Sequence, residues 1–225
     1  GVAEKADIVI LEGTYGYSID TELPDKTEFI EYLADCIPQG KRIIIPAFVL
    51  DRSQQVIAAI KQGVESQRLP ADTKVSLLSP SANEITEIYL DIFPQYKNVG
   101  LSSSYSETID IRPFYKEITK LKDWDPKTIL VTSSGMANMG YSMETVKRFI
   151  SDPDTVFMFV GYQDPETIGG ELNNLANETA ITIDGECYDI LATVQKFSCF
   201  RGHAAFPQMC QLLDQIERIE KLILV

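Results

Sequence analysis

The chain has 225 residues, of which 44% are hydrophobic and 24% charged, and its formal net charge is −13. These values are ordinary for a soluble globular protein with one large or two small domains, and no stretch approaches the roughly 20 apolar residues of a membrane span. The negative charge argues against indiscriminate nucleic-acid binding through a basic surface, although a local basic groove remains compatible with it. The four cysteines form no CxxC pair, which favours free thiols and a cytoplasmic protein. Because no apolar stretch is long enough for a membrane span, we expect no membrane contact.

Short apolar runs alternate with helical patterns along the first 160 residues. The strand candidates are compact, apolar and β-branched, as strands buried on both faces are; they are residues 7–11, 42–46, 75–78, 128–132 and 156–160. The helix candidates are residues 26–36 with Asp25 as N-cap, 52–67 with Asp51 as N-cap, 81–93 and 139–150. This alternation predicts an α/β fold with a three-layer, doubly wound, mostly parallel sheet.

Two other regions do not follow this alternation. Residues 98–113 are small and polar and form either a substrate-facing loop or a plain connection. From residue 180 onwards, residues 180–183 and 188–194 flank Asp184-Gly185-Glu186, which predicts a hairpin. A helix at 207–216 and a strand at 222–225 follow. We therefore expect the two ends of the chain to share one domain, into which the middle is inserted.

His203 is the only histidine, and it precedes the last predicted helix. A carboxylate paired with it would hold its tautomer and make it a general acid near neutral pH. Glu12, which ends the first predicted strand beside Gly13, is the carboxylate that we expect to do so. The alternatives are a satisfied polar histidine and, for Glu12, a helix cap or a surface charge.

Two further stretches are candidates for anion binding. Ser133, Ser134 and Gly135 follow a predicted strand, and small residues at such a place form either a phosphate cradle or an ordinary tight turn. Arg52 begins a predicted helix, where a cation is unfavourable for the helix dipole. Arg52 therefore faces an anion or forms an ion pair with Glu12 or another carboxylate.

Six short stretches of the sequence form an ordered series of motifs. They are Glu12-Gly13-Thr14-Tyr15-Gly16, Ile45-Pro46-Ala47-Phe48 with Arg52 and Gln54, Ser79-Pro80-Ser81-Ala82, Ser134-Gly135-Met136, Val160-Gly161-Tyr162-Gln163 and Phe200-Arg201-Gly202-His203-Ala204. In this order they resemble the motifs of the β-CASP branch of the metallo-β-lactamase superfamily, in particular RNA-processing nucleases related to the mRNA 3′-end cleavage endonuclease and its bacterial and archaeal homologues. The chain departs from the family pattern at Gly13 and Arg201, where Ser is usual, and at Gln55, where Glu is usual.

The resemblance implies a Rossmann-like β-CASP domain at residues 18–178, inserted into a metallo-β-lactamase domain. Residues 1–17 and 179–225, with their strands and a helix, are then parts of that second domain. The family's zinc-ligand run His-x-His-x-Asp-His does not occur in this sequence, so we interpret both ends as cuts and expect no metal ligand in this chain. Two zinc ions, held elsewhere in the complete protein, would supply the hydroxide that attacks phosphorus.

The same resemblance assigns roles to residues of this chain. It implies that His203 protonates the leaving ribose oxygen and that Glu12 orients His203. The residues that it implies for binding RNA phosphates are Ser133, Ser134, Gly135, Arg52 and Arg201.

The implied function is an endonucleolytic, zinc-dependent ribonuclease, of which this chain is the lid and would be inactive by itself. The implied partners are single-stranded RNA, the remainder of the metallo-β-lactamase domain and, as an alternative left open, a second copy of the chain. Tyr15, Tyr17, Tyr105 and Tyr162 either stack on bases or pack within the protein. Two alternatives remain: a non-catalytic relative that binds RNA or protein, and a small-molecule-binding Rossmann-like domain. The lack of GxGxxG and Walker patterns disfavours the latter.

Overall fold

A computed structural model describes residues 5–19, 25–96, 111–174, 179–200 and 202–225. The chain divides into two compact units. The terminal unit combines residues 1–24 with residues 201–225, and the central unit spans residues 25–200. Among the helices described, none is long and apolar enough to cross a membrane.

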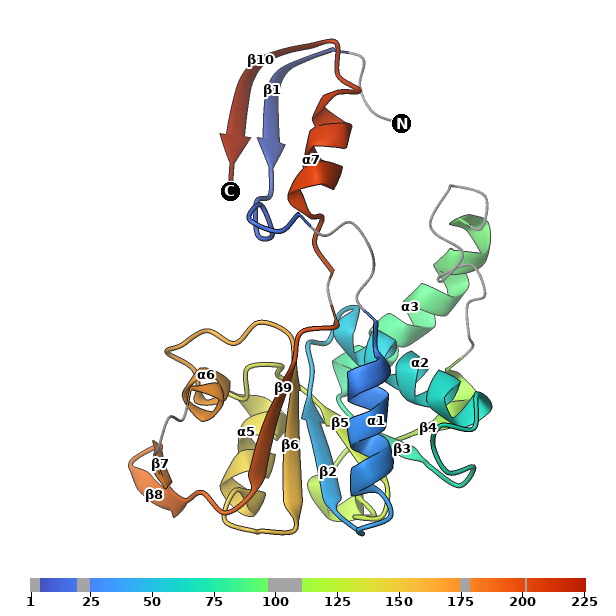
Figure 1. Ribbon diagram of the computed structural model, residues 1–225, viewed down its shortest axis with the longest axis vertical. Helices are drawn as coiled ribbons and strands as arrows, with labels where there is room; N and C mark the ends of the chain where they lie inside the picture. The colour runs from blue at the N-terminus through green and yellow to red at the C-terminus, as the bar shows by residue number, and fades with distance from the viewer. Residues whose placement is uncertain (1–4, 20–24, 97–110, 175–178, 201) are drawn as a thin grey trace. The chain divides into compact units, whose positions relative to one another are not determined.

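The central unit contains a six-stranded sheet in which every neighbouring pair is parallel (Figure 1). Its spatial order is β4 (Tyr115–Glu117), β3 (Val75–Leu78), β5 (Ile129–Thr132), β2 (Arg42–Pro46), β6 (Thr155–Val160) and β9 (Thr193–Phe197). Every residue of β3, β5 and β6 is buried, which explains why these strands are mostly apolar instead of alternating.

Helices cover both faces of this sheet, as Figure 1 shows. They are α1 (Thr27–Cys36), α2 (Arg52–Glu65), α3 (Pro80–Tyr96), α5 (Gly140–Phe149) and α6 (Ile168–Asn173). Successive residues of β2 point to opposite sides: Ile43 and Ile45 join the core under α1 and α2, whereas Ile44 joins the core under α5 and α6. The predicted three-layer α/β fold with a doubly wound parallel sheet is therefore confirmed.

Two helix starts differ in how their acidic residues are used. Asp25 accepts hydrogen bonds from the backbone N–H and the hydroxyl of Thr27, at 3.0 and 2.8 Å, although the N-cap residue of α1 is Lys26, one position after the predicted Asp25. Asp51 occupies the predicted N-cap position of α2, but its side chain makes no capping hydrogen bond. Its backbone has a positive φ of 69°, and its carboxylate binds side chains of α2 instead.

The region after residue 179 differs from the prediction in one respect. The hairpin exists: β7 (Ala180–Ile183) and β8 (Glu186–Asp189) are antiparallel, and Asp184 and Gly185 both have the positive φ of a tight hairpin turn. The predicted strand at 188–194 is wrong, because the chain leaves the hairpin after β8 and starts β9 beside β6. The division into compact units thus places β7, β8 and β9 in the central unit. The domain boundaries 1–17, 18–178 and 179–225 that the resemblance implies stay a prediction.

The terminal unit brings the two ends of the chain together. β1 (Lys5–Leu11) lies parallel to β10 (Arg218–Leu224), in a register that places Leu11 opposite Leu224. β10 starts earlier than the predicted 222–225, and α7 (Phe206–Leu213) precedes it. A further parallel bridge joins Tyr15 to Ala205. The segments after β1 and before α7 therefore lie side by side.

Candidate functional site

Glu12 and His203 form an ion-pair contact within the terminal unit. His203 Nδ1 lies 3.2 Å from Glu12 Oε2, and the two side chains are 46% and 42% exposed. Their closeness follows from local pairing: Gly13 N–H donates to the Val225 carbonyl at 2.8 Å, while Tyr15 bridges Ala205. The structure thus brings together the two residues predicted to be catalytic, and their role in catalysis stays a prediction.

The electrostatics of Glu12 favour its ionised form. The hydroxyl of Thr14 lowers the pKa of Glu12, and so do the Thr14 backbone N–H, 3.1 Å from Oε2, and the nearby His203. Partial burial opposes these effects without cancelling them. An ionised Glu12 accepts a hydrogen bond from His203 Nδ1–H, so proton exchange with a ligand would run through Nε2.

The aromatic ring of Tyr15 borders this pair. Its centroid lies 5.5 Å from that of the His203 imidazole, in an edge-on arrangement, and 6.1 Å from the ring of Tyr17. Tyr17 is 81% exposed, which leaves its ring accessible for stacking. The predicted phosphate ligand Arg201 and the candidate stacking residue Tyr105 lie outside the described residues.

A second group of predicted site residues lies at the carboxyl edge of the central sheet, where the parallel strands end. Ser133, Ser134 and Gly135 follow β5 directly, and we call residues 133–136 the serine loop. Ser133 Oγ donates to Ser79 Oγ at 2.9 Å, and Ser134 Oγ donates to Asn138 Oδ1 at 3.0 Å. A phosphate would therefore have to compete for these hydroxyl protons, so its binding here stays a prediction.

The serine loop is packed against its neighbours on both sides. A Cβ atom on Gly135 would approach Phe48 to 2.8 Å at the ring and 2.9 Å at the backbone nitrogen, so only glycine fits. On the other side, buried Gln163 donates to the Gly135 carbonyl at 2.9 Å, and Gly169 N–H donates to the Met136 carbonyl at 2.9 Å. The motifs after β2, β5 and β6 are thus parts of one packed edge.

Arg52 is almost buried, and its guanidinium contacts the carboxylate of its neighbour Asp51. Gln55 donates to the same carboxylate, from Nε2 to Oδ2 at 2.7 Å. Of the two alternatives for Arg52, the structure shows an ion pair, and the partner is Asp51. Sequence reasoning missed this role of Asp51, although its spacing of four residues from Gln55 was a signal for contact across one helical turn.

The described residues do not provide a metal centre. None of their histidine, cysteine, aspartate and glutamate side chains form a group of three that could hold a metal ion. Glu12 and His203 alone supply two donors, fewer than a structural or catalytic zinc site uses. The described part of this chain therefore does not by itself provide the ligands of a zinc ion.

Comparisons with known proteins place the chain in a family. The Beta-Casp domain family matches residues 53–172, just over half of the chain. Ribonuclease TTHA0252 of Thermus thermophilus is 28% identical over 98% of this chain and 51% of its own length. The RNase J-like protein of Methanocaldococcus jannaschii is 26% identical (99% and 52%), and transcription termination factor FttA of Methanococcus maripaludis is 25% identical (98% and 36%). The chain thus spans about half, or less, of these relatives. It belongs to the Beta-Casp domain family, as the order of its motifs indicated.

Proposed function

We propose that this chain is the Beta-Casp part of a ribonuclease, and that His203 acts in the complete protein as the general acid that protonates the leaving ribose oxygen. The observation that carries the proposal is the 3.2 Å contact between His203 Nδ1 and Glu12 Oε2. The names of two relatives, a ribonuclease and an RNase J-like protein, support RNA as the substrate. Zinc held by residues outside the described chain would supply the nucleophile.

The roles of the two residues follow from their protonation. Glu12, whose pKa is lowered chiefly by the Thr14 hydroxyl, stays ionised and fixes the imidazole through Nδ1. Protonated Nε2 then carries the proton that the departing oxygen needs. General acid catalysis by a positioned histidine contributes about 10²- to 10⁴-fold to a rate.

The central unit would hold the RNA strand, which we expect to be single-stranded. Its serine loop offers small residues at a strand end, and Tyr162 directly after β6 is 59% exposed and can stack on a base. Arg52 contributes a positive charge that Asp51 already balances in part. The 225-residue chain without the metal-binding segments should not cleave RNA.

The test uses the complete protein with His203→Ala, measured in single-turnover cleavage of a single-stranded RNA. We expect a loss of about 10²- to 10⁴-fold with unchanged zinc content. A substrate with a bridging phosphorothiolate, whose sulfur leaves without a proton, should recover most of this loss. The Glu220→Gln variant, which alters an exposed residue of β10 in the same unit, serves as a control for unspecific disturbance of that unit.

Two results would contradict the proposal. Undiminished cleavage by His203→Ala would remove the general-acid role. If the unaltered complete protein binds RNA but neither binds zinc nor cleaves, the alternative of a non-catalytic relative holds.

A further inference from the structure

Lys26 lies at the carboxyl edge of the central sheet, where the serine loop also lies. It directly precedes α1, and α1 leads through residues 37–41 into the amino end of β2 (Figure 1). Because α1 runs antiparallel to β2, its first residues reach the carboxyl edge. β9 ends at the same edge, and the Lys26 ammonium lies 5.4 Å from the ring centroid of Phe200, shortly after β9.

The Lys26 side chain is half-buried on an aromatic support. Phe200 is 1% exposed and packs edge-on against Phe29, with 4.9 Å between the ring centroids. Burial is the main cause that lowers the pKa of Lys26; Cys199 and Asp51 oppose it, and the charge of Arg52 makes the smallest contribution, in the same direction as burial. The ammonium thus lies in a place where water stabilises it only partly.

Among the described residues, the Lys26 ammonium takes part in no hydrogen bond or ion pair. The nearby carboxylates are already engaged: Asp51 by Arg52 and Gln55, and Asp25 by Thr27. Burial raises the pKa of the Cys199 thiol to about 11, so this neighbour is uncharged near neutral pH. A half-buried cation that no carboxylate contacts directly is costly, and an incoming anion would reduce that cost.

We propose that Lys26 binds a backbone phosphate of single-stranded RNA at the carboxyl edge, beside Arg52. This inference rests on the proposed function, because it takes RNA as the ligand. Proteins that hold single-stranded nucleic acid track the phosphates with cations and the bases with aromatic rings. In a chain with a net charge of −13, such a local cation would matter more than the average surface charge.

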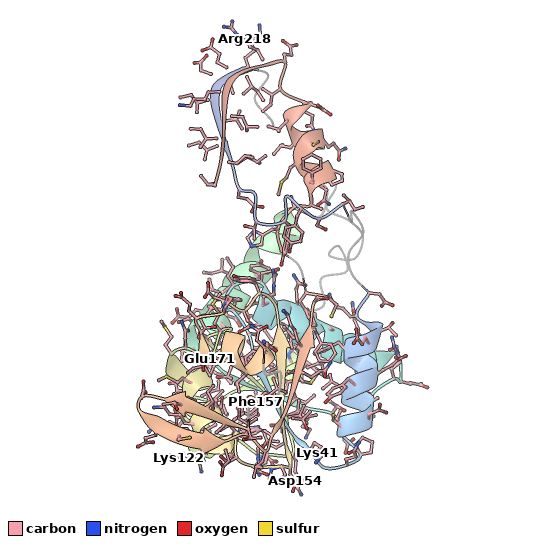
Figure 2. The ribbon with its side chains drawn as sticks, turned by 60° about the vertical axis from the view of Figure 1, so that its left-hand side comes forward. Lys41, Lys122, Asp154, Phe157, Glu171 and Arg218 are labelled. Atoms are coloured by element: carbon pink, nitrogen blue, oxygen red, sulfur yellow. The ribbon has the colours of Figure 1, made fainter. Side chains whose placement is uncertain are left out.

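The experiment measures the affinity of the 225-residue chain for a fluorescent single-stranded oligouridylate at several salt concentrations. Lys26→Gln removes the charge, and Lys26→Arg keeps it. Lys122→Gln is the matched control, because Lys122 precedes β5 at the opposite, amino end of the sheet (Figure 2). Thermal unfolding of each variant checks that the fold persists.

We expect Lys26→Gln to weaken binding about three- to tenfold and to reduce the slope of log K against log salt by about 0.7, the value for one phosphate contact on a single strand. Lys26→Arg should keep most of the affinity, and Lys122→Gln should match the unaltered chain. RNA binding with an unchanged affinity and slope in Lys26→Gln would overturn the Lys26 assignment alone. Absence of binding by the unaltered chain at low salt would overturn RNA binding by this chain and the assignment with it.

Discussion

The two units bury their apolar residues to very different extents. In the central unit, the strands lie between two hydrophobic cores, and the loops at the carboxyl edge are packed against one another. In the terminal unit, Ile8 and Ile10 of β1 are 60% and 67% exposed, and Leu224 of β10 is 65% exposed. Exposed apolar strands of this kind mark an interaction surface. The contrast supports the proposal that the remainder of a metallo-β-lactamase domain covers the terminal unit.

The same contrast applies to the two groups of candidate site residues. Glu12 and His203 are nearly half exposed and are positioned by a few local hydrogen bonds. The serine loop is positioned by buried neighbours such as Gln163 and Phe48. Substitutions should therefore disturb the central unit through packing and the terminal unit through local electrostatics.

The largest expected difference concerns apolar truncation. Phe157 of β6 is fully buried (Figure 2), so Phe157→Ala should lower the free energy of unfolding by about 3–5 kcal/mol. Ile10→Ala removes an apolar side chain that is 67% exposed and should change it by less than about 0.5 kcal/mol. Urea unfolding of the 225-residue chain, followed by circular dichroism, measures both. A large loss in Ile10→Ala would mean that β1 is covered in solution, for instance by a second copy of the chain.

Two glycine substitutions, one in each unit, should sharpen the comparison. A Cβ atom on Gly169 would overlap Gln163 Oε1 and approach the Met136 carbonyl to 2.9 Å, so Gly169→Ala should cost about 1–3 kcal/mol. In the terminal unit, a Cβ atom on Gly13 would meet the Val225 carbonyl at an ordinary 3.7 Å. Gly13→Ala should therefore be almost neutral in the same unfolding experiment. Equal losses of stability in the two variants would show that Gly169 and Gly13 are equally constrained by their neighbours.

The ion pair of Arg52 provides a smaller test within the central unit. Asp51→Asn keeps a residue that tolerates positive φ but removes the counter-charge, so it should cost about 1–2 kcal/mol. The double variant Asp51→Asn/Gln55→Glu restores a carboxylate at the position where the family usually has Glu. Recovery of stability in urea unfolding would show that Asp51 compensates for Gln55. If the double variant is no more stable than Asp51→Asn, the two side chains are not interchangeable.

The buried part of the fold could be predicted from sequence because burial leaves a clear pattern. Strands β2, β3, β5 and β6 are mostly apolar runs, and the sequence predicted all four. β4, with the polar sequence Tyr-Lys-Glu at the sheet edge, was missed because an edge strand needs no apolar run. The prediction of one strand at 188–194 was wrong because sequence alone does not show that β8 ends at residue 189 and that β9 starts at residue 193.

The candidate site was predictable only where motifs or residue chemistry pointed to it. The pairing of Glu12 with His203 followed from the need of a single histidine for a carboxylate and from the resemblance to the family. The hydrogen bond from Gln163 to Gly135 and the position of Lys26 beside Phe200 depend on which strands are neighbours in the sheet. Tertiary contacts of this kind have no local sequence signal.

The smallest expected effect is a change in the titration of Glu12. Because the Thr14 hydroxyl is the main cause of its lowered pKa, Thr14→Val should raise the pKa of Glu12 towards the ordinary glutamate value. Carboxyl-carbon NMR titration of the 225-residue chain measures this, and Glu28 of α1 provides an internal reference in the same spectra.

The sign of the pH effect follows from the direction of the shift. A carboxyl group whose pKa is lowered by folding stabilises the fold at pH values above its ordinary pKa, and this contribution disappears as the pH falls through the lowered value. Glu12 is 42% exposed, so water screens the contribution, and the titration is a more sensitive readout than unfolding. An unchanged Glu12 titration in Thr14→Val would assign the shift to the backbone N–H of residue 14 and to His203 instead. The expected shift would show that the exposed pair is tuned by one local hydroxyl, without the packing that positions the serine loop.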